Sequence, residues 1–469
     1  MNAASTDAIV DLARFVLATD FRSLSEDVKW ATRVEIIDTV GCTLGGHGVV
    51  ATEGLSAVAG GPREGNWGSV WGAQMRHSAP DAALLNGTIG HALEFDDTHD
   101  SGALHVGVTV IPAAVAAAES IGARGIDVLS GTVAGIEVAA RLAKAINVGP
   151  GVSGWLLTPL CGYFGAAAGA GRVLGLNEEQ LIHAFGLAYA QAAGNGQATL
   201  DGGEAKRTQA GFAARGGLLA AMLAKSGVTA ARSVLEGPRG FFRVYHQSDY
   251  ERDRLTEDLG SRFEVDQLSL KPYPCCRWTH AAIETAFALR ESGVDVAEID
   301  RIEVLVNQQS YNSTGSDPER RQRPATPIEA QFSIPYTFAV AFLRGRVGLE
   351  HFTEDAIRNE DVLALARRVV PLASVAQDGS AARSLSGAVT TISTIGGEFF
   401  RESVASPSQL RPGLSSLGEI RDKFQNLGQF GGLDEEFVRR SLHRLEHLDE
   451  IDHIAELLPV ASEELEAQA

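Results

Sequence analysis

The sequence predicts a mainly α-helical fold with a smaller α+β part inserted into it. Apolar residues recur at helical spacing over most of the chain, whereas the alternation typical of strands is confined to residues after about Asp266. The helical period then returns from Gly418. We therefore expect a large all-α domain formed by residues 1–266 and 408–469 and an α+β lid domain over residues 267–407.

The N-terminal part opens with a helical pattern. Ser23 and Glu26 have the spacing of a capping box, which predicts a helix over residues 23–44. Residues 111–143 and 163–187 are rich in Ala and Gly, with Val, Leu, Ile and Phe between them. Helices of this composition are apolar nearly all round, so we expect them at the centre of the domain and not in a flexible linker.

The inserted part contains the strand signals. Residues 302–306 alternate between apolar and polar side chains, and residues 388–395 and 399–404 flank the pair Gly396 and Gly397. The second pattern predicts a strand, a turn and a second strand. The C-terminal part then places apolar residues on one face of a charged helical segment, at Leu433, Phe437, Leu442, Leu445, Leu448 and Ile451.

Length and charge narrow the classes of function. A chain of 469 residues exceeds what one hydrophobic core usually serves. Fifty-nine Asp and Glu residues against 40 Lys and Arg residues give a net charge of −19, which excludes polyanion binding as the main role. Four cysteines are too few for a disulfide framework, and no apolar run approaches the roughly 20 residues of a membrane span. We expect a cytoplasmic protein that binds neither nucleic acid nor membranes.

The densest cluster of polar side chains lies in residues 86–105. Asp96, Asp97 and Asp100 match the Asp-Asp-x-x-Asp pattern with which helical isoprenoid enzymes hold Mg²⁺ on a diphosphate. Those enzymes also need a second acidic motif and an aromatic cavity, whereas this chain has no second motif and 7% aromatic residues. A magnesium-dependent isoprenoid enzyme is therefore the more remote alternative.

The same cluster has two further interpretations. His91, His99 and His105 could bind a transition metal together with the aspartates, although no His-x-x-x-His pair supports such a site. The polar residues could instead cap helix ends and satisfy buried backbone groups. We expect no metal in this cluster.

Lys206 and Arg207 follow a glycine-rich stretch and precede a helix of small residues. Two cations near a helix N-terminus suit a carboxylate ligand, because the helix dipole also favours an anion there. The alternative is a solvated pair of cations that is neutralised by Asp201 and Glu204.

Two further segments stand near the start of predicted helices. Residues 271–280 place two prolines around an aromatic residue where the composition changes, which predicts a stiff crossing between domains. Residues 331–336 lead into an apolar helix and set Ser333 and Tyr336 at its start, where either residue could simply be a cap.

These patterns together resemble one family, the MmgE/PrpD superfamily, whose members include 2-methylcitrate dehydratase, cis-aconitate decarboxylase and iminodisuccinate epimerase. The resemblance covers roughly nine tenths of the chain. The matching segments are residues 86–87 with 91–99, 134–142, 206–241, 271–280 and 331–352. The resemblance implies a homodimer, a large all-α domain formed from both chain ends, an inserted α+β lid, and a cofactor-independent site between them.

The resemblance also implies a set of site residues. The positions that match the family's pattern are Glu94, Thr98, His105, Lys206, Lys271 and Tyr336. This chain departs from the pattern at Glu94, where Asp is common, and at Val106, where Pro is common. Leu156 and Cys276 stand where the decarboxylase carries two histidines.

The activities of this family all begin at a carbon next to a carboxylate, so the shared state resembles a carbanion and needs cations. Lys206, Arg207 and Lys271 would hold the substrate carboxylates. His105 and Tyr336 would be the general base and acid. The full set has His105, Tyr336, Lys206, Thr98 and Glu94 as catalytic residues and Lys271, Arg207, Asp97, Cys276 and Ser333 as substrate-binding residues.

We expect a cofactor-independent lyase, specifically a hydro-lyase of a di- or tricarboxylic acid, because dehydration requires only a base, an acid and carboxylate clamps. The alternative within the family is an epimerase of an imino or amino dicarboxylate, which the two missing histidines favour. A non-catalytic dimeric binding protein is the alternative outside enzymes. The absence of histidine at Leu156 and Cys276 also predicts negligible conversion of cis-aconitate to itaconate.

Overall fold

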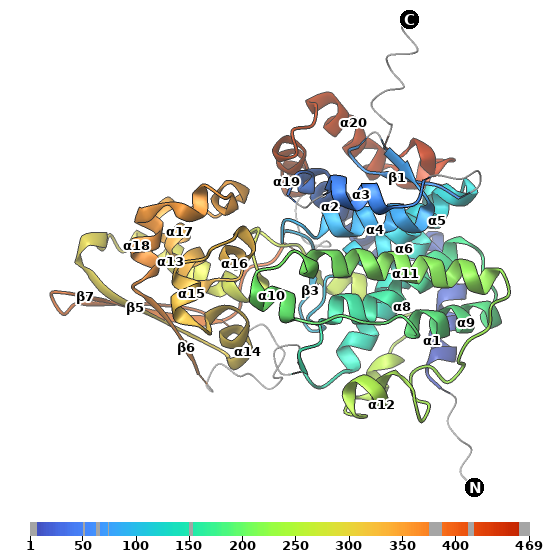
Figure 1. The fold of residues 1–469 in the computed structure, drawn as a ribbon, viewed down its shortest axis with the longest axis horizontal. Helices are drawn as coiled ribbons and strands as arrows, with labels where there is room; N and C mark the ends of the chain where they lie inside the picture. Colours follow the sequence, from blue (N-terminus) through green and yellow to red (C-terminus); the bar gives the residue numbers. More distant parts are fainter. Residues whose placement is uncertain are drawn as a thin grey trace, which may run out of the picture.

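The structure is a computed structural model that describes residues 7–49, 52–61, 66–73, 75–149, 153–374, 387–410 and 417–458. It consists of a large helical body and a smaller part that contains a four-stranded sheet (Figure 1). The prediction of a mainly α fold is confirmed. Within the described ranges, no helix combines the length and the apolar composition that crossing a bilayer requires.

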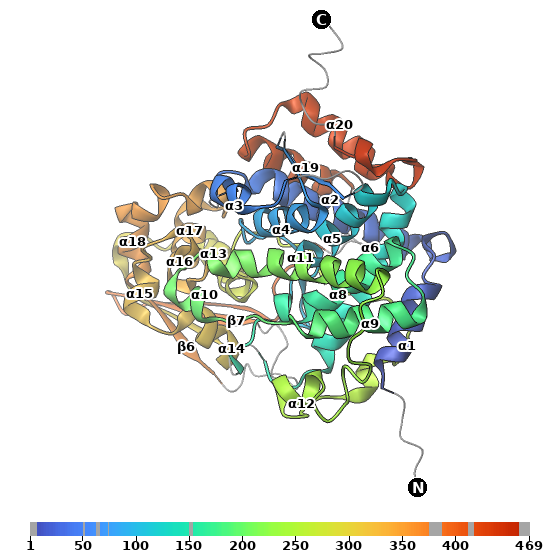
Figure 2. The same ribbon diagram turned by 45° about the vertical axis from the view of Figure 1, so that its right-hand side comes forward.

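The helical body contains most of the helices. Its helices are α1 Ile9–Ala18, α2 Glu26–Gly46, α3 Thr52–Val58, α4 Ala79–Gly90, α5 Gly107–Ile121, α6 Gly125–Ala145, α8 Leu157–Val173, α9 Glu178–Tyr189, α10 Gln197–Asp201, α11 Ala205–Lys225, α12 Phe241–His246, α19 Leu417–Phe430 and α20 Glu435–Glu446. Its short strands are β1 Gly68–Val70, β2 Met75–His77, β3 Thr98–His99 and β4 Leu268–Ser269. In both views α19 and α20 lie beside α2, so the two chain ends share one body (Figure 2).

The start of α2 differs from the predicted capping box. The helix begins at Glu26, and the side chain of Ser25 accepts a hydrogen bond from the backbone nitrogen of Val28 at 3.3 Å. Ser23 belongs to a preceding 3-10 turn, where its hydroxyl donates to the carbonyl oxygen of Asp20. The prediction that Ser23 caps this helix was wrong, because Ser25 stands at the correct distance from the first free backbone N–H groups.

The Ala- and Gly-rich helices occupy the centre of the body, as predicted. Helices α5, α6 and α8 are buried along nearly their whole length. A Cβ atom on Gly135 of α6 would lie 2.7 Å from the carbonyl oxygen of Gly165 on α8. Glycine at this position therefore allows the two helices to approach more closely than any other residue would.

The smaller part combines helices with the sheet. Its elements are α13 His280–Glu291, β5 Ile299–Val306, α14 Gln308–Ser310, α15 Pro318–Gln322, α16 Pro327–Gln331, α17 Ile334–Arg344, α18 Glu360–Ala366, β6 Val369–Ala373, β7 Ala388–Thr394 and β8 Phe399–Val404. The strand order is β6-β5-β7-β8, with β5 and β6 parallel and the other pairs antiparallel. The predicted strand, turn and strand around Gly396 and Gly397 are confirmed.

The buried apolar residues form two main clusters. The larger cluster draws on residues 8–270 and 420–458, and the second draws on residues 275–392. The chain crosses from the first to the second at β4, which pairs with β3 so that Thr98 lies opposite Ser269. This pairing brings the polar loop after α4 next to the crossing. The division of the chain at residues 266 and 408 into domains stays a prediction.

Candidate active site

A cavity of about 440 Å³ lies between the helical body and the smaller part. The body contributes the loop after α4, the start of α8, α10 and the start of α11, while the smaller part contributes residues around 276–278, 309–313 and Phe332. Of the predicted site residues, the structure brings five to this cavity: Glu94, Thr98, His105, Lys206 and Cys276. Leu156, the other position that departs from the decarboxylase pattern, also lines it.

The loop between α4 and α5 supplies most of the polar groups. Glu94 adopts a left-handed backbone conformation with φ of +54°, which is uncommon for a residue other than glycine. Asp97 lies within this loop, and its carboxylate accepts hydrogen bonds from the backbone nitrogens of Val106 and Gly107 at 3.0 and 3.1 Å. Asp97 therefore caps the start of α5 and does not line the cavity.

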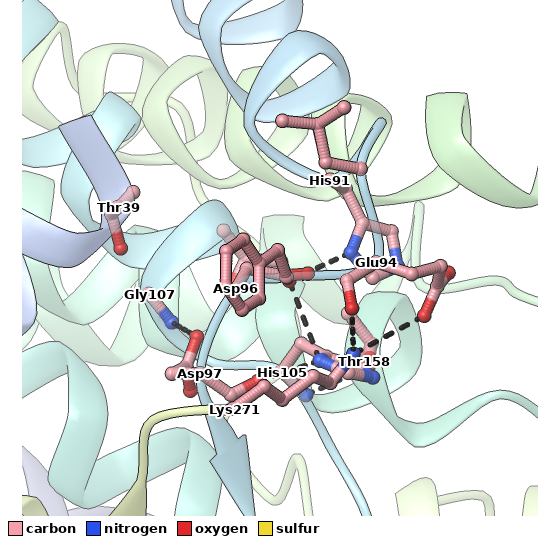
Figure 3. A network of polar contacts seen from close by, with 12 residues as sticks. Thr39, His91, Glu94, Asp96, Asp97, His105, Gly107, Thr158 and Lys271 are labelled. Atoms are coloured by element: carbon pink, nitrogen blue, oxygen red, sulfur yellow. Dashed lines mark hydrogen bonds and ion pairs between the residues drawn. The ribbon is translucent and has the colours of Figure 1, made fainter. Parts of the chain in front are cut away.

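Lys206 is held at the N-terminus of α11 by two acceptors. Its Nζ atom forms an ion pair with Glu94 and lies 2.8 Å from Nε2 of His91. Nδ1 of His91 lies 2.7 Å from the carboxylate of Asp96 (Figure 3). His91 therefore donates to Asp96 and accepts from Lys206. Burial lowers the pKa of Lys206 well below its ordinary value, and the charge of Lys271 lowers it further.

His105 lies at the start of α5 with one ring nitrogen already engaged. Its Nδ1 atom lies 2.6 Å from the backbone carbonyl oxygen of Asp97, and its backbone nitrogen donates to the hydroxyl of Thr158 at 2.9 Å (Figure 3). A carbonyl oxygen only accepts, so Nδ1 carries the proton and Nε2 carries the free lone pair. Burial lowers the pKa of His105 to about 3, although the carboxylate of Asp96 opposes the shift. The ring is therefore a neutral proton acceptor near pH 7.

Lys271 lies behind Glu94 and is fully buried. Its Nζ atom donates to the backbone carbonyl oxygen of Glu94 at 2.8 Å and to the carboxylate at 3.3 Å (Figure 3). Glu94 thus faces two lysines, Lys206 on the cavity side and Lys271 behind it. Thr98 lines the cavity, and its buried hydroxyl makes no hydrogen bond to any described residue.

Besides Asp97 and Lys271, three more of the predicted residues do not line this cavity. The hydroxyl of Tyr336 donates to the backbone carbonyl oxygen of His351 at 2.7 Å, inside the core of the smaller part. Ser333 caps α17 by accepting from the backbone nitrogen of Tyr336 at 3.0 Å. Arg207 points to a second cavity of about 310 Å³ and donates to the side chain of Gln331 at 3.3 Å. The predicted clamp of three cations is therefore reduced to Lys206.

The magnesium interpretation of the three aspartates was wrong. Asp96 bonds to His91, Asp97 caps α5, and Asp100 forms an ion pair with Arg277 at 3.3 Å. The three carboxylates face different partners, so they do not converge on one cation as a diphosphate-binding motif requires.

The structure does not bring all three histidines together as a transition-metal site. His99 pairs with Glu264 at 2.9 Å and is not part of the cluster. His91, Asp96 and His105 do lie close together, with their potential ligand atoms within 4.8 Å of one another. In the arrangement that the structure describes, Nδ1 of His91 contacts the carboxylate of Asp96, and Nδ1 of His105 contacts the backbone carbonyl oxygen of Asp97.

Sequence reasoning missed one buried cation that organises this region. Lys423 on α19 forms an ion pair with Asp38 at 2.6 Å and donates to the backbone carbonyl oxygens of Phe95 and Lys271 at 2.7 and 3.3 Å. Its ammonium also lies 4.0 Å from the ring centre of Phe95. The signal was a lysine on a helix face that is otherwise apolar.

The sequence matches two family models and several known relatives. The family models described as the MmgE/PrpD N-terminal domain and the MmgE/PrpD C-terminal domain match residues 10–253 and 273–445. The chain is 29% identical to a cis-aconitate decarboxylase-like protein of Aspergillus oryzae over 97% of both chains. It is 31% identical to a cis-aconitate decarboxylase of Aspergillus terreus, over 81% of this chain and 82% of the relative.

A human cis-aconitate decarboxylase is 28% identical over 64% of this chain and 63% of its own length. The family and these relatives together support an enzyme of the lyase type. Two family models that follow each other along the chain, one matching 10–253 and the other 273–445, establish the relationship. The chain belongs to the MmgE/PrpD family.

Proposed function

We propose that the protein is a cofactor-independent hydro-lyase that removes water from a hydroxylated di- or tricarboxylic acid. The observation that carries the proposal is the placement of His105 and Lys206 on one cavity, each with its hydrogen-bonding state fixed by neighbours. One supplies a basic nitrogen and the other an acidic ammonium. Dehydration of a β-hydroxy acid requires these two groups on one substrate.

His105 is the proposed general base. Its Nε2 atom takes the proton from the carbon next to a substrate carboxylate, because Nδ1 is committed to the carbonyl oxygen of Asp97. The free lone pair on Nε2 is the acceptor for this proton. The electrons of the broken C–H bond then pass towards the carboxylate, whose developing charge the ammonium of Lys206 stabilises.

Lys206 is the proposed acid, in place of Tyr336. Two of its three N–H groups meet Glu94 and His91, which leaves the third for the substrate. As the C–O bond breaks and the C=C bond forms, Lys206 gives its proton to the leaving hydroxide, which departs as water. Its lowered pKa makes this transfer easier than from an ordinary lysine. Proton exchange with solvent then restores both His105 and Lys206.

A second candidate is the decarboxylation of cis-aconitate, which is favoured by the relative that matches over 97% of both chains. In that reaction a C–C bond breaks, carbon dioxide leaves, and the remaining carbanion takes a proton. Lys206 could supply that proton, but Leu156 and Cys276 stand where the decarboxylase pattern has two histidines, and Leu156 offers no proton. We therefore place dehydration first.

The test is to incubate the wild type and two Lys206 variants with citrate, isocitrate, malate and cis-aconitate in the presence of a chelator, and to identify the products by NMR. We expect an alkene product from a hydroxy acid. Lys206→Met should raise KM and lower kcat. Lys206→Arg keeps the positive charge but is a poor proton donor, so it should change KM less than kcat.

Other outcomes of this experiment separate the alternatives. Itaconate from cis-aconitate, with no alkene from any hydroxy acid, would support decarboxylation instead. An imino or amino dicarboxylate that keeps its formula while one centre inverts would support the epimerase.

The proposal includes a homodimer, because the family resemblance implies one. Light scattering at micromolar concentration should give twice the mass of the chain, and a monomer would contradict this part of the proposal.

A further inference from the structure

The charged side chains that line the active-site cavity balance each other. Among the lining residues that the structure describes, the cations are Lys206 and Arg277, and the carboxylates are Glu94 and Asp100. Arg277 pairs with Asp100, and Lys206 shares Glu94 with the buried Lys271, which leaves one net positive charge behind the lining. A substrate with three carboxylates would bring more negative charge into this space than that one charge compensates. The lining therefore suits an acid with few carboxylates.

Much of the remaining wall is apolar and comes from both sides of the cavity. On the side of the smaller part, Phe332 and Cys276 belong to one buried cluster against which Trp278 packs. On the side of the helical body, Leu156 and Pro159 contribute from the start of α8. Apolar walls with a few fixed polar groups are typical of pockets that bind a partly apolar ligand.

The apolar wall leads from the catalytic groups to the opening. Lys206 and Phe332 are 6% and 7% exposed, and the ammonium of Lys206 lies 5.3 Å from the ring centre of Phe332. Leu200 on α10 lines the same cavity but is 47% exposed. In both ribbon views α10 lies on the side of the helical body that faces α16 (Figure 2). Leu200 is thus the exposed member of the apolar lining whose buried member is Phe332, and Asn195, Gln197 and Thr199 line the cavity beside it.

We propose that the substrate of this lyase carries an apolar chain of several carbons in addition to its carboxylates. The carboxylate end lies at Lys206 and His105, and the chain lies along Phe332, Leu156 and Leu200 towards the opening. This inference rests on the proposed function for the reaction itself, but the binding of the apolar chain can be measured without turnover.

The first experiment uses calorimetry to measure the binding of succinate and of its methyl, n-butyl and n-hexyl derivatives. These compounds lack a leaving hydroxyl, so the result does not depend on the reaction. Burial of a methylene is worth about 0.8 kcal/mol, which corresponds to about a fourfold gain in affinity per methylene until the chain passes Leu200. Affinity that stays flat or falls with chain length would overturn the proposal.

The second experiment compares two substitutions at exposed apolar residues. Leu200→Asn places a polar amide on the wall, whereas Val244→Asn makes the same kind of change on α12, at a residue that is 56% exposed and lies outside the cavity. We expect hexylsuccinate to bind at least fivefold more weakly to Leu200→Asn and within twofold of wild type to Val244→Asn. Equal effects of the two changes would contradict the placement of the chain. Leu156→Asn repeats the test at the inner part of the wall.

Turnover gives a third readout that separates this inference from the proposed function. Hydroxy acids with and without the alkyl chain are compared by kcat/KM, which should rise with chain length. If unsubstituted acids react best and alkylated ones do not react, the inference is wrong while the proposed function stands. If no hydroxy acid reacts but alkylsuccinates bind with the expected chain-length dependence, the proposed function is wrong while the apolar site stands.

Discussion

The Nδ1 atom of His105 lies 2.6 Å from the backbone carbonyl oxygen of Asp97, and this contact fixes which nitrogen of the ring is basic. The carboxylate of the same Asp97 accepts hydrogen bonds from the backbone nitrogens of Val106 and Gly107, at the start of α5 just after His105. One residue therefore positions both the ring and the helix that follows it. The backbone of the loop thus orients His105, and the carboxylate of Asp96 lies 3.4 Å from the same ring nitrogen.

Tyr336→Phe should leave turnover within about twofold of wild type. The hydroxyl of Tyr336 bonds to the carbonyl oxygen of His351 and does not line the cavity. Loss of this buried hydrogen bond should cost about 1 kcal/mol of unfolding free energy. Urea unfolding and steady-state kinetics measure the two quantities. A 10²-fold loss of kcat would instead support the prediction that Tyr336 transfers a proton in the reaction.

Lys423→Met should destabilise the protein by about 3–5 kcal/mol, because Asp38 would remain buried without its partner. The matched control is Lys29→Met, which removes an ion pair with the exposed Glu26 at 2.8 Å and should cost less than about 1 kcal/mol. Adding Asp38→Asn to Lys423→Met should recover part of the loss, since it removes the stranded charge. Urea unfolding that shows equal losses for Lys423→Met and Lys29→Met would contradict the role of this buried pair.

The sequence predicts the helices and strands well because their signals are local. The alternation at residues 302–306 and the small residues at 111–143 depend only on spacing along the chain. Tyr336 shows where this reasoning ends, since its position at the start of α17 does not reveal that its hydroxyl points into the core of the smaller part. The contact of Lys423 is harder to predict, because its ammonium donates to the carbonyl oxygen of Phe95, a residue 328 positions away along the chain. Such contacts depend on how the elements pack.

Glu119→Gln should change how stability depends on pH. Burial raises the pKa of Glu119 from 4.5 to about 7, and Ser69 donates to both of its oxygens. Between pH 4.5 and 7, Glu119 is protonated in the folded protein and ionised in the unfolded chain. This difference stabilises the folded state fully below pH 4.5. The stabilisation is lost as the pH rises from 4.5 through 7. The stability of Glu119→Gln relative to wild type should therefore rise by up to about 3 kcal/mol over this range.

The control for this pH experiment is Glu291→Gln, which changes an exposed carboxyl. Its stability relative to wild type should stay constant from pH 4.5 to 8. Thermal unfolding at several pH values measures both variants, and a relative stability of Glu119→Gln that falls as the pH rises would contradict the direction of the shift.

Wild-type protein should convert cis-aconitate to itaconate at a negligible rate. Leu156 and Cys276 both line the cavity, at the places where the family resemblance puts histidines in the decarboxylase. Leu156 has no proton to give, and burial raises the pKa of the Cys276 thiol, which makes it a still weaker acid. Introducing Leu156→His and Cys276→His together should raise itaconate formation by about 10²-fold or more, as judged by direct product assay. Substantial itaconate from the wild type would contradict the preference for dehydration.

In the proposed mechanism, Nε2 of His105 removes a proton from the carbon next to a substrate carboxylate, without a metal. The most direct measurement is the transfer of solvent deuterium into the hydroxy acid substrate, followed by NMR in deuterated water that contains a chelator. We predict exchange by the wild type and by His453→Gln, which changes an exposed histidine, and at least about 10²-fold slower exchange by His105→Gln. Exchange by His105→Gln at the wild-type rate, or exchange that stops with the chelator and returns with Mg²⁺, would contradict the claim.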